Sequence, residues 1–250
     1  MPPRDQPPAW SPDPTGIRNT PSVVDQIRIP TPNQRVLVVL CMDTSYSMRG
    51  EAIDRLNEAL RGWSVSIGKH SMAAATEFAL ITFGANGVRK WRGPESFDPR
   101  SDRTPFIPAA EFRPPTLVAD GVTPLAAAVR LSVDVIEARK RQLRQQRINW
   151  RRPLVWLVTD GRPTDETGNF SADWKPLVGE IRALERDRKL TLFAIGIPPI
   201  DAEGQNTLRE LAPNNYRIYG DFDFNDILVQ LDRSVEDPSR SIRDATWRQV

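Results

Sequence analysis

The feature that most constrains the fold is a series of short, almost entirely apolar runs, separated by segments with helical periodicity. Residues 35–42 (RVLVVLCM) and 154–159 (LVWLVT) are apolar nearly throughout, as strands are when both faces of their sheet are covered. Between them, apolar residues from Ile53 to Ile67 recur at steps of three and four, the spacing of an amphipathic helix. Strands that alternate with helices in this way predict an α/β fold, doubly wound around a mostly parallel sheet.

The same patterns predict six strands and five helices along the chain. The strands cover residues 35–42, 77–83, 88–91, 154–159, 190–197 and 216–219. The helices cover residues 53–67, 125–136, 174–184, 208–211 and 224–231. Thr123-Pro124 precedes the second helix, where Thr suits the N-cap and Pro suits the first helical position.

The composition argues against several classes of protein. Lys and Arg total 34 and Asp and Glu total 32, a net charge of +2, which does not indicate a generally basic nucleic-acid binder. Cys41 and His70 are the single Cys and His of the sequence, too few for a disulfide framework or a structural zinc site. No apolar run approaches the ~18 residues of a membrane span, and no signal-like apolar core follows Met1. We therefore expect a soluble, cytoplasmic protein without a membrane partner.

Proline marks the predicted domain boundaries. Nine of the 23 prolines fall within residues 1–34, which predicts a Pro-rich extended N-terminal arm. Residues 35–235 hold the alternating elements and form the predicted domain, and residues 236–250 form a mixed-charge C-terminal tail. Residues 95–110 lack helix signals and are predicted to be a loop insertion.

Polar side chains follow two of the predicted strands. Asp43, Ser45 and Ser47 come after residues 35–42, Asp160 comes after residues 154–159, and Thr123 begins a helix between them. In a doubly wound sheet, ligands bind outside the carboxyl ends of the strands. Because all five side chains offer oxygen, they favour Mg²⁺, with Ca²⁺ and Mn²⁺ as alternatives, over zinc or copper.

Asp43-x-Ser45-x-Ser47, followed by Thr123 and Asp160, resembles the metal-ion-dependent adhesion site (MIDAS) of von Willebrand factor A (VWA) domains. The likeness covers residues 35–235. It implies a Rossmann-like sheet with strand order 3-2-1-4-5-6, in which residues 88–91 form a short antiparallel edge strand, and it implies no catalysis.

Within that family the chain looks most like the bacterial TerY-like proteins. Four stretches bear this closer likeness: residues 43–48 (DTSYSM), 111–115 (EFRPP), 121–125 (GVTPL) and 159–165 (TDGRPTD). The likeness implies a role in stress response or tellurium resistance, alongside a Ser/Thr kinase and a PP2C-type phosphatase.

A rim of side chains beside the metal is expected to contact the partner. It comprises Tyr46, where TerY-like proteins usually have Gly, together with Arg162 and Asp165. Asp165 also suits the cap of a loop or helix. The insertion at residues 95–110 is expected near the site, because it leads to Thr123.

Three functions remain open from the sequence. The first is a non-catalytic module in which the metal binds a Glu or Asp of a partner protein. The second is a Mg²⁺-dependent phosphohydrolase of the haloacid dehalogenase type, although that chemistry resembles Asp-x-Asp and position 45 is Ser. The third is a structural subunit with a vestigial metal site.

The sequence also contains one strongly basic stretch, residues 139–152. It suits an acidic partner or nucleic acid, but cations are also favoured in the last turn of a helix. We favour the interpretation as a solvated helix end.

Overall fold

A computed structural model describes residues 34–69, 72–84, 87–91, 104–221 and 224–236. Its central layer is a sheet with the strand order β3-β2-β1-β6-β7-β8. These strands are β1 (Gln34–Thr44), β2 (Thr76–Gly84), β3 (Gly87–Lys90), β6 (Leu154–Thr159), β7 (Thr191–Gly196) and β8 (Tyr216–Ile218). The helices are α1 (Glu51–Ile67), α2 (Leu125–Gln145), α3 (Lys175–Arg186), α4 (Ala202–Leu211) and α5 (Phe224–Glu236).

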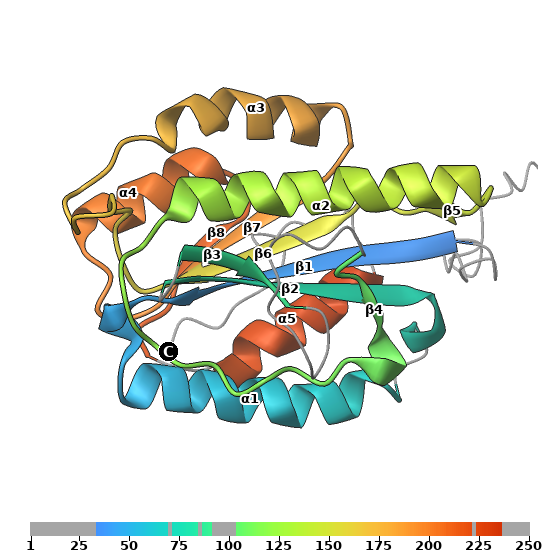
Figure 1. Cartoon of the computed structure of the whole chain (residues 1–250), viewed down its shortest axis with the longest axis horizontal. Coiled ribbons are helices and arrows are strands. Elements are labelled where there is room, and N and C mark those ends of the chain that lie inside the picture. Colours follow the sequence, from blue (N-terminus) through green and yellow to red (C-terminus); the bar gives the residue numbers. More distant parts are fainter. Residues whose placement is uncertain (1–33, 70–71, 85–86, 92–103, 222–223, 237–250) are drawn as a thin grey trace, which may run out of the picture. The chain divides into compact units, whose positions relative to one another are not determined.

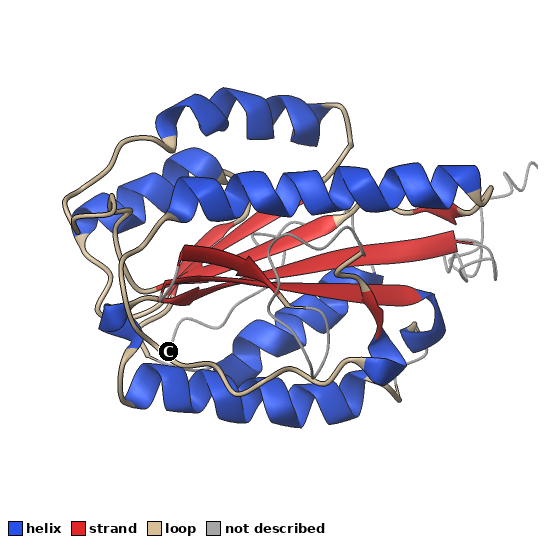
Figure 2. Ribbon diagram, viewed as in Figure 1, coloured by secondary structure: helices blue, strands red, loops and turns tan. Residues whose placement is uncertain are grey.

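Helices cover both faces of the sheet (Figures 1 and 2). Helices α2, α3 and α4 lie on one face, and α1 and α5 lie on the other. Successive residues of β1 point to opposite faces, so Val38 and Leu40 join the core beneath α1 and α5, whereas Val39 and Cys41 join the core beneath α2 and α3. This double burial explains why the strand is apolar at nearly every position.

The predicted doubly wound sheet is confirmed. β1 pairs in parallel with β2 and β6, and β3 pairs with β2 in antiparallel orientation as the short edge strand. Two strands of two residues each extend the predicted set of six, β4 (Ile107–Pro108) on β2 and β5 (Asn149–Trp150) on β1. Helix α2 continues past the predicted end at residue 136 to Gln145, and Leu143 in this extension is buried.

The expected position of the 95–110 insertion is wrong for the part that the structure describes. Ile107 and Pro108 pair with Phe78 and Glu77 at the start of β2. The residues predicted to bind the metal lie at the opposite end of the sheet. The chain then returns to that end along α1 (Figure 1). This segment, which follows residue 111, rather than the insertion itself, brings Thr123 to the site.

The predicted boundaries of the domain stay predictions. The described residues begin with β1 at Gln34 and end with α5 at Glu236. Three predicted features lie outside the described residues: the rest of the arm and the tail, residues 95–103 of the insertion, and His70. Among the described helices, none is long and apolar enough to cross a membrane.

Gly84 closes the edge of the sheet beside the metal-site sequence and has no room for a side chain. It pairs with Thr44, and a Cβ atom on Gly84 would lie 2.2 Å from the Thr44 carbonyl oxygen. We expect Gly84→Ala to lower the free energy of unfolding by about 2 kcal/mol or more, measured by urea denaturation.

Gly62 in α1 gives the matched control, since no atom lies within 4 Å of its ideal Cβ position. Gly62→Ala should raise the free energy of unfolding by about 0.5–1 kcal/mol, because Ala favours the helical backbone. Equal effects of the two substitutions would contradict the close approach at Gly84.

Candidate metal site

The ends of two adjacent parallel strands bring two carboxylates together. Asp43 is the penultimate residue of β1, and Asp160 directly follows β6. The strands pair in register at Met42 and Val158, so both chains leave the sheet at the same edge. Asp43 and Asp160 are both buried.

A chain of hydrogen bonds connects the two carboxylates. The Ser45 backbone N–H donates to Asp43 Oδ1 at 2.8 Å. Ser45 Oγ and Ser47 Oγ are 3.1 Å apart, and Ser47 Oγ donates to Asp160 Oδ1 at 2.9 Å. Thr159 Oγ1 donates to Asp43 Oδ2. Ser45 is buried whereas Ser47 is exposed, so the cluster is accessible to solvent at Ser47.

The loop before α2 is held beside this cluster by backbone hydrogen bonds. The Tyr46 N–H donates to the Gly121 carbonyl at 2.9 Å, and the Asp120 N–H donates to the Thr44 carbonyl at 2.8 Å. Thr123 is buried in the same loop. The structure therefore brings all five predicted ligands, Asp43, Ser45, Ser47, Thr123 and Asp160, to one edge of the sheet.

The site disfavours negative charge in the absence of a cation. Burial, with the charge of Asp160 as a second cause, raises the pKa of Asp43 to about 7. Burial likewise raises the pKa of Asp160 to about 6. A divalent cation would offset the charge of both carboxylates.

One carboxylate oxygen lacks a partner. Asp160 Oδ2 is buried and accepts no hydrogen bond from the described part of the chain, which is costly for a polar atom. Among the described residues, no three or more His, Cys, Asp or Glu side chains form a group suited to a metal. Any ion here would therefore be held by the two carboxylates together with the hydroxyl oxygens. These hard donors fit Mg²⁺, Ca²⁺ or Mn²⁺.

The sequence that carries this site matches a known domain family. The von Willebrand factor type A domain family matches residues 38–162, a span that includes all five oxygen-bearing residues. The chain belongs to this family. Comparison with curated proteins gives no match.

Solved structures resemble the VWA domain in fold. The pilus adhesin SpaC from Lactobacillus rhamnosus GG is 14% identical, with a TM-score of 0.59 over 82% of this chain and 31% of that chain. The human COPII-coat protein Sec24c is 13% identical, with a TM-score of 0.55 over 82% of this chain and 33% of that chain. The chain thus spans about a third of each of these proteins.

Thr123 does not have the expected position at the start of the helix. Helix α2 begins at Leu125 with Pro124 at the N-cap, and no side chain caps it, so the predicted Thr123 cap is wrong. Instead, the Thr123 N–H donates to Thr164 Oγ1 at 2.7 Å, and its carbonyl accepts from the Thr164 N–H at 3.0 Å. These bonds fix Thr123 against the loop after β6.

Tyr46, a predicted rim residue, lies between Ser45 and Ser47. Its side chain is 61% exposed, and the Arg49 guanidinium lies over its ring at 4.3 Å from the centroid. Arg49 also pairs with Asp120 at 2.9 Å. This ion pair connects the loop after β1 with the loop before α2. The sequence analysis missed Arg49 and Asp120, because nothing in their spacing indicates this pairing.

The other two predicted rim residues have structural partners. Asp165 Oδ1 accepts hydrogen bonds from the backbone N–H groups of Thr167 and Asn169, at 2.8 and 3.0 Å, which is the loop-cap role also considered from the sequence. The hydrogen bond from the Thr167 hydroxyl is the main cause of the lowered pKa of Asp165. Arg162 pairs with Glu203 of α4 at 2.7 Å. A contact of either residue with a partner protein stays a prediction.

Thr159 is the main site residue that the sequence analysis did not single out. Its position at the end of a strand beside β1 was a usable signal, because neighbouring parallel strands end together. We expect Thr159→Val, which keeps the shape but removes the hydroxyl donor to Asp43, to lower the unfolding free energy of metal-free protein by about 1–3 kcal/mol.

Chemical denaturation in EDTA measures this loss. Thr167→Val is the control, since it removes a hydroxyl that donates to Asp165 in an exposed loop and should change stability by less than about 0.5 kcal/mol. If Thr159→Val is as stable as the wild type, the hydrogen bond from Thr159 to Asp43 contributes nothing to stability.

Proposed function

We propose that this VWA domain is a non-catalytic protein-interaction module that acts through a bound divalent cation. Asp43, Ser45, Ser47, Thr123 and Asp160 would hold the ion, which binds an Asp or Glu side chain of a partner. The observation that supports this most directly is the buried Asp160 Oδ2, which accepts no hydrogen bond from the described residues.

The chemistry of the donors supports a role in binding a carboxylate. Two carboxylates balance the charge of a divalent ion, and the neutral hydroxyls of Ser45, Ser47 and Thr123 add little electron density to it. An ion held this way keeps strong attraction for a further anionic oxygen. We propose Mg²⁺ as the resident ion, with Ca²⁺ and Mn²⁺ as the alternatives that the same oxygens accept.

The phosphohydrolase alternative has less support. Both carboxylate oxygens of Asp43 accept hydrogen bonds, from the Ser45 N–H and from Thr159 Oγ1, which does not favour the exposed nucleophile that such an enzyme needs. Position 45 supplies a hydroxyl rather than a second carboxylate. The vestigial-site alternative predicts no response to metal and is tested below.

The biological setting follows from the sequence resemblance alone. We propose a TerY-like protein of a cytoplasmic stress-response or tellurium-resistance system, with a Ser/Thr kinase and a PP2C-type phosphatase as partners. Tyr46, Arg162 and Asp165 would form the rim around the partner's acidic residue.

Metal binding should stabilise the wild-type protein but not Asp43→Ala. An ion at about 100 times its Kd adds about 2.7 kcal/mol to the unfolding free energy, or roughly 5–10 °C in Tm for a domain of this size. Differential scanning calorimetry with Mg²⁺, Mn²⁺ or Ca²⁺ against EDTA measures the shift. Asp134→Asn, an exposed carboxylate of α2, is the control and should keep the full shift. No shift with any ion supports the vestigial site instead.

Partner binding should depend on the same ion. Wild type and Asp43→Ala are used to capture proteins from the native host, with and without EDTA, and mass spectrometry identifies them. We expect the direct partners to be lost both in EDTA and in Asp43→Ala, and kept by Asp134→Asn. Partners that persist fully in excess chelator would contradict a metal-bridged contact.

A further inference from the structure

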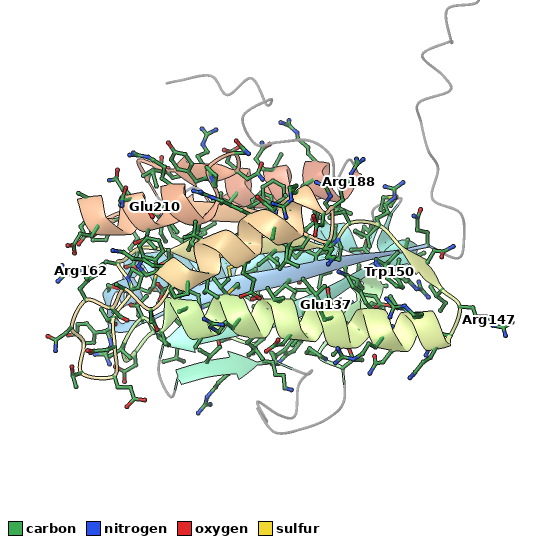
Figure 3. The ribbon with its side chains drawn as sticks, turned by 90° about the horizontal axis from the view of Figure 1, so that it is seen from above. Glu137, Arg147, Trp150, Arg162, Arg188 and Glu210 are labelled. Atoms are coloured by element: carbon green, nitrogen blue, oxygen red, sulfur yellow. The ribbon has the colours of Figure 1, made fainter. Side chains whose placement is uncertain are left out.

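A cavity lies at the opposite end of the sheet from the metal site. It has a volume of about 450 Å³ and lies between the C-terminal ends of α2 and α3 and the loop that enters β6. This volume is within the usual range for small-molecule pockets. Figure 3 shows Trp150 and Arg188 at this end, and Arg162 near the opposite end.

The lining of the cavity is strongly basic. Its cations are Lys140, Arg144, Arg151, Arg152, Arg188 and Lys189. The carboxylate of Glu137 also lines it, but accepts a hydrogen bond from Lys140 Nζ at 2.7 Å. The whole chain has a net charge of only +2, so the excess positive charge is a local property of this pocket.

The predicted basic stretch of residues 139–152 divides in the structure. Arg139 is outside the pocket lining and makes two hydrogen bonds to the buried Glu77 carboxylate, at 2.7 and 2.8 Å. Arg144, Arg151 and Arg152 line the pocket, where Arg188 and Lys189 join them from a distant part of the sequence. The interpretation as a solvated helix end therefore does not describe the whole stretch.

Arg152 is in an unfavourable electrostatic position. Its side chain is half-buried, and burial together with the charge of Arg188 lowers its pKa. Its hydrogen bond to Thr191 Oγ1 is long, at 3.4 Å. The charge of Glu185 offsets part of this effect on the pKa of Arg152, and Glu185 Oε1 also accepts a hydrogen bond from the Leu192 N–H at 2.9 Å. An anion between Arg152 and Arg188 would relieve their repulsion.

Arg188 has a left-handed backbone conformation, which is unfavourable for residues other than Gly. Arg188 follows α3 with a φ of 56°, and the Lys189 N–H donates to the Leu184 carbonyl at 2.8 Å, the hydrogen-bond pattern of a helix terminus that usually has Gly. A residue with a side chain is less stable than Gly in this left-handed region. Arg188 thus stands where Gly would be more stable, with its side chain on the pocket.

Helix termini explain only part of the charge. Cations are favoured near the C-terminus of a helix, where the partial charge is about −0.5, and this accounts for Arg144 and Arg188. Arg151 and Arg152 lie between β5 and β6 instead, on neither helix. The partial charges of the two helix ends together offset about one of the cations.

We propose that this pocket binds a phosphate-bearing small molecule, with Arg152 and Arg188 contacting the phosphate oxygens. The guanidinium group matches phosphate through paired hydrogen bonds. Trp150, Pro153 and Leu184 add an apolar wall. A nucleotide and an inorganic polyphosphate share the phosphate chemistry, and differ in whether they use this wall.

Isothermal titration calorimetry of the full chain tests the proposal, with inorganic triphosphate and ATP as probes. EDTA is present throughout, so that a phosphate bound through an ion at the metal site does not contribute. We expect both probes to bind at about 50 mM salt, more weakly as salt rises. Arg188→Gly should weaken binding about tenfold or more.

Arg147→Gly is the matched control. Arg147 follows α2 with a φ of 57°, outside the pocket lining, and Figure 3 shows it at the far end of that helix, directed away from Trp150 and Arg188. Both Gly variants should unfold at a Tm equal to or above that of the wild type, because Gly accepts this backbone conformation. Only Arg188→Gly should lose affinity.

Tighter binding of ATP than of triphosphate supports a nucleotide, and equal binding supports recognition of the phosphate chain alone. The proposal is overturned if neither probe binds at low salt, if Arg188→Gly binds as well as wild type, or if Arg147→Gly loses as much affinity. Binding of an oligonucleotide but of neither probe overturns it as well. Because the measurement is made in EDTA, its result is independent of the metal-site proposal.

Discussion

The register of β1 between β2 and β6 is the constraint on which the candidate site depends. Asp43 pairs with Phe83 on one side, and Met42 pairs with Val158 on the other. A shift of one residue would turn the apolar side chains of β1 to the opposite faces, which the two different cores do not permit. The same register sets Asp43 next to the residue that precedes Asp160, so core packing fixes the distance between the carboxylates.

Much of this arrangement could be predicted from the sequence, for identifiable reasons. Apolar runs and helical periodicity report burial, so they predict six of the strands and the five helices, and the family resemblance supplies the order of those strands. Hydrogen bonds between distant loops leave no such pattern. The Thr123 contact with Thr164, the Arg49 pairing with Asp120 and the pairing of residues 107–108 with β2 all depend on tertiary packing.

The nearly neutral composition conceals a separation of charge. The buried carboxylates of Asp43 and Asp160 lie at the carboxyl ends of the strands, and six arginines and lysines line the 450 Å³ cavity at the opposite end. The sequence showed the cations at residues 139–152, but not that the turn after α3 adds Arg188 and Lys189 or that buried Glu77 binds Arg139. Positions in the sequence could not reveal which of these cations share one surface.

The long segment that returns along α1 has a consequence for ligand affinity. The Asn57 side chain both donates to the Leu117 carbonyl, at 2.9 Å, and accepts from the Leu117 N–H, at 2.7 Å. The irregular segment that leads to Thr123 is therefore fixed to a helix before any ligand arrives. Ordering a loop costs about 1–2 kcal/mol per residue. A ligand at this edge of the sheet meets a surface that folding has already ordered, and its binding free energy is not reduced by that entropy.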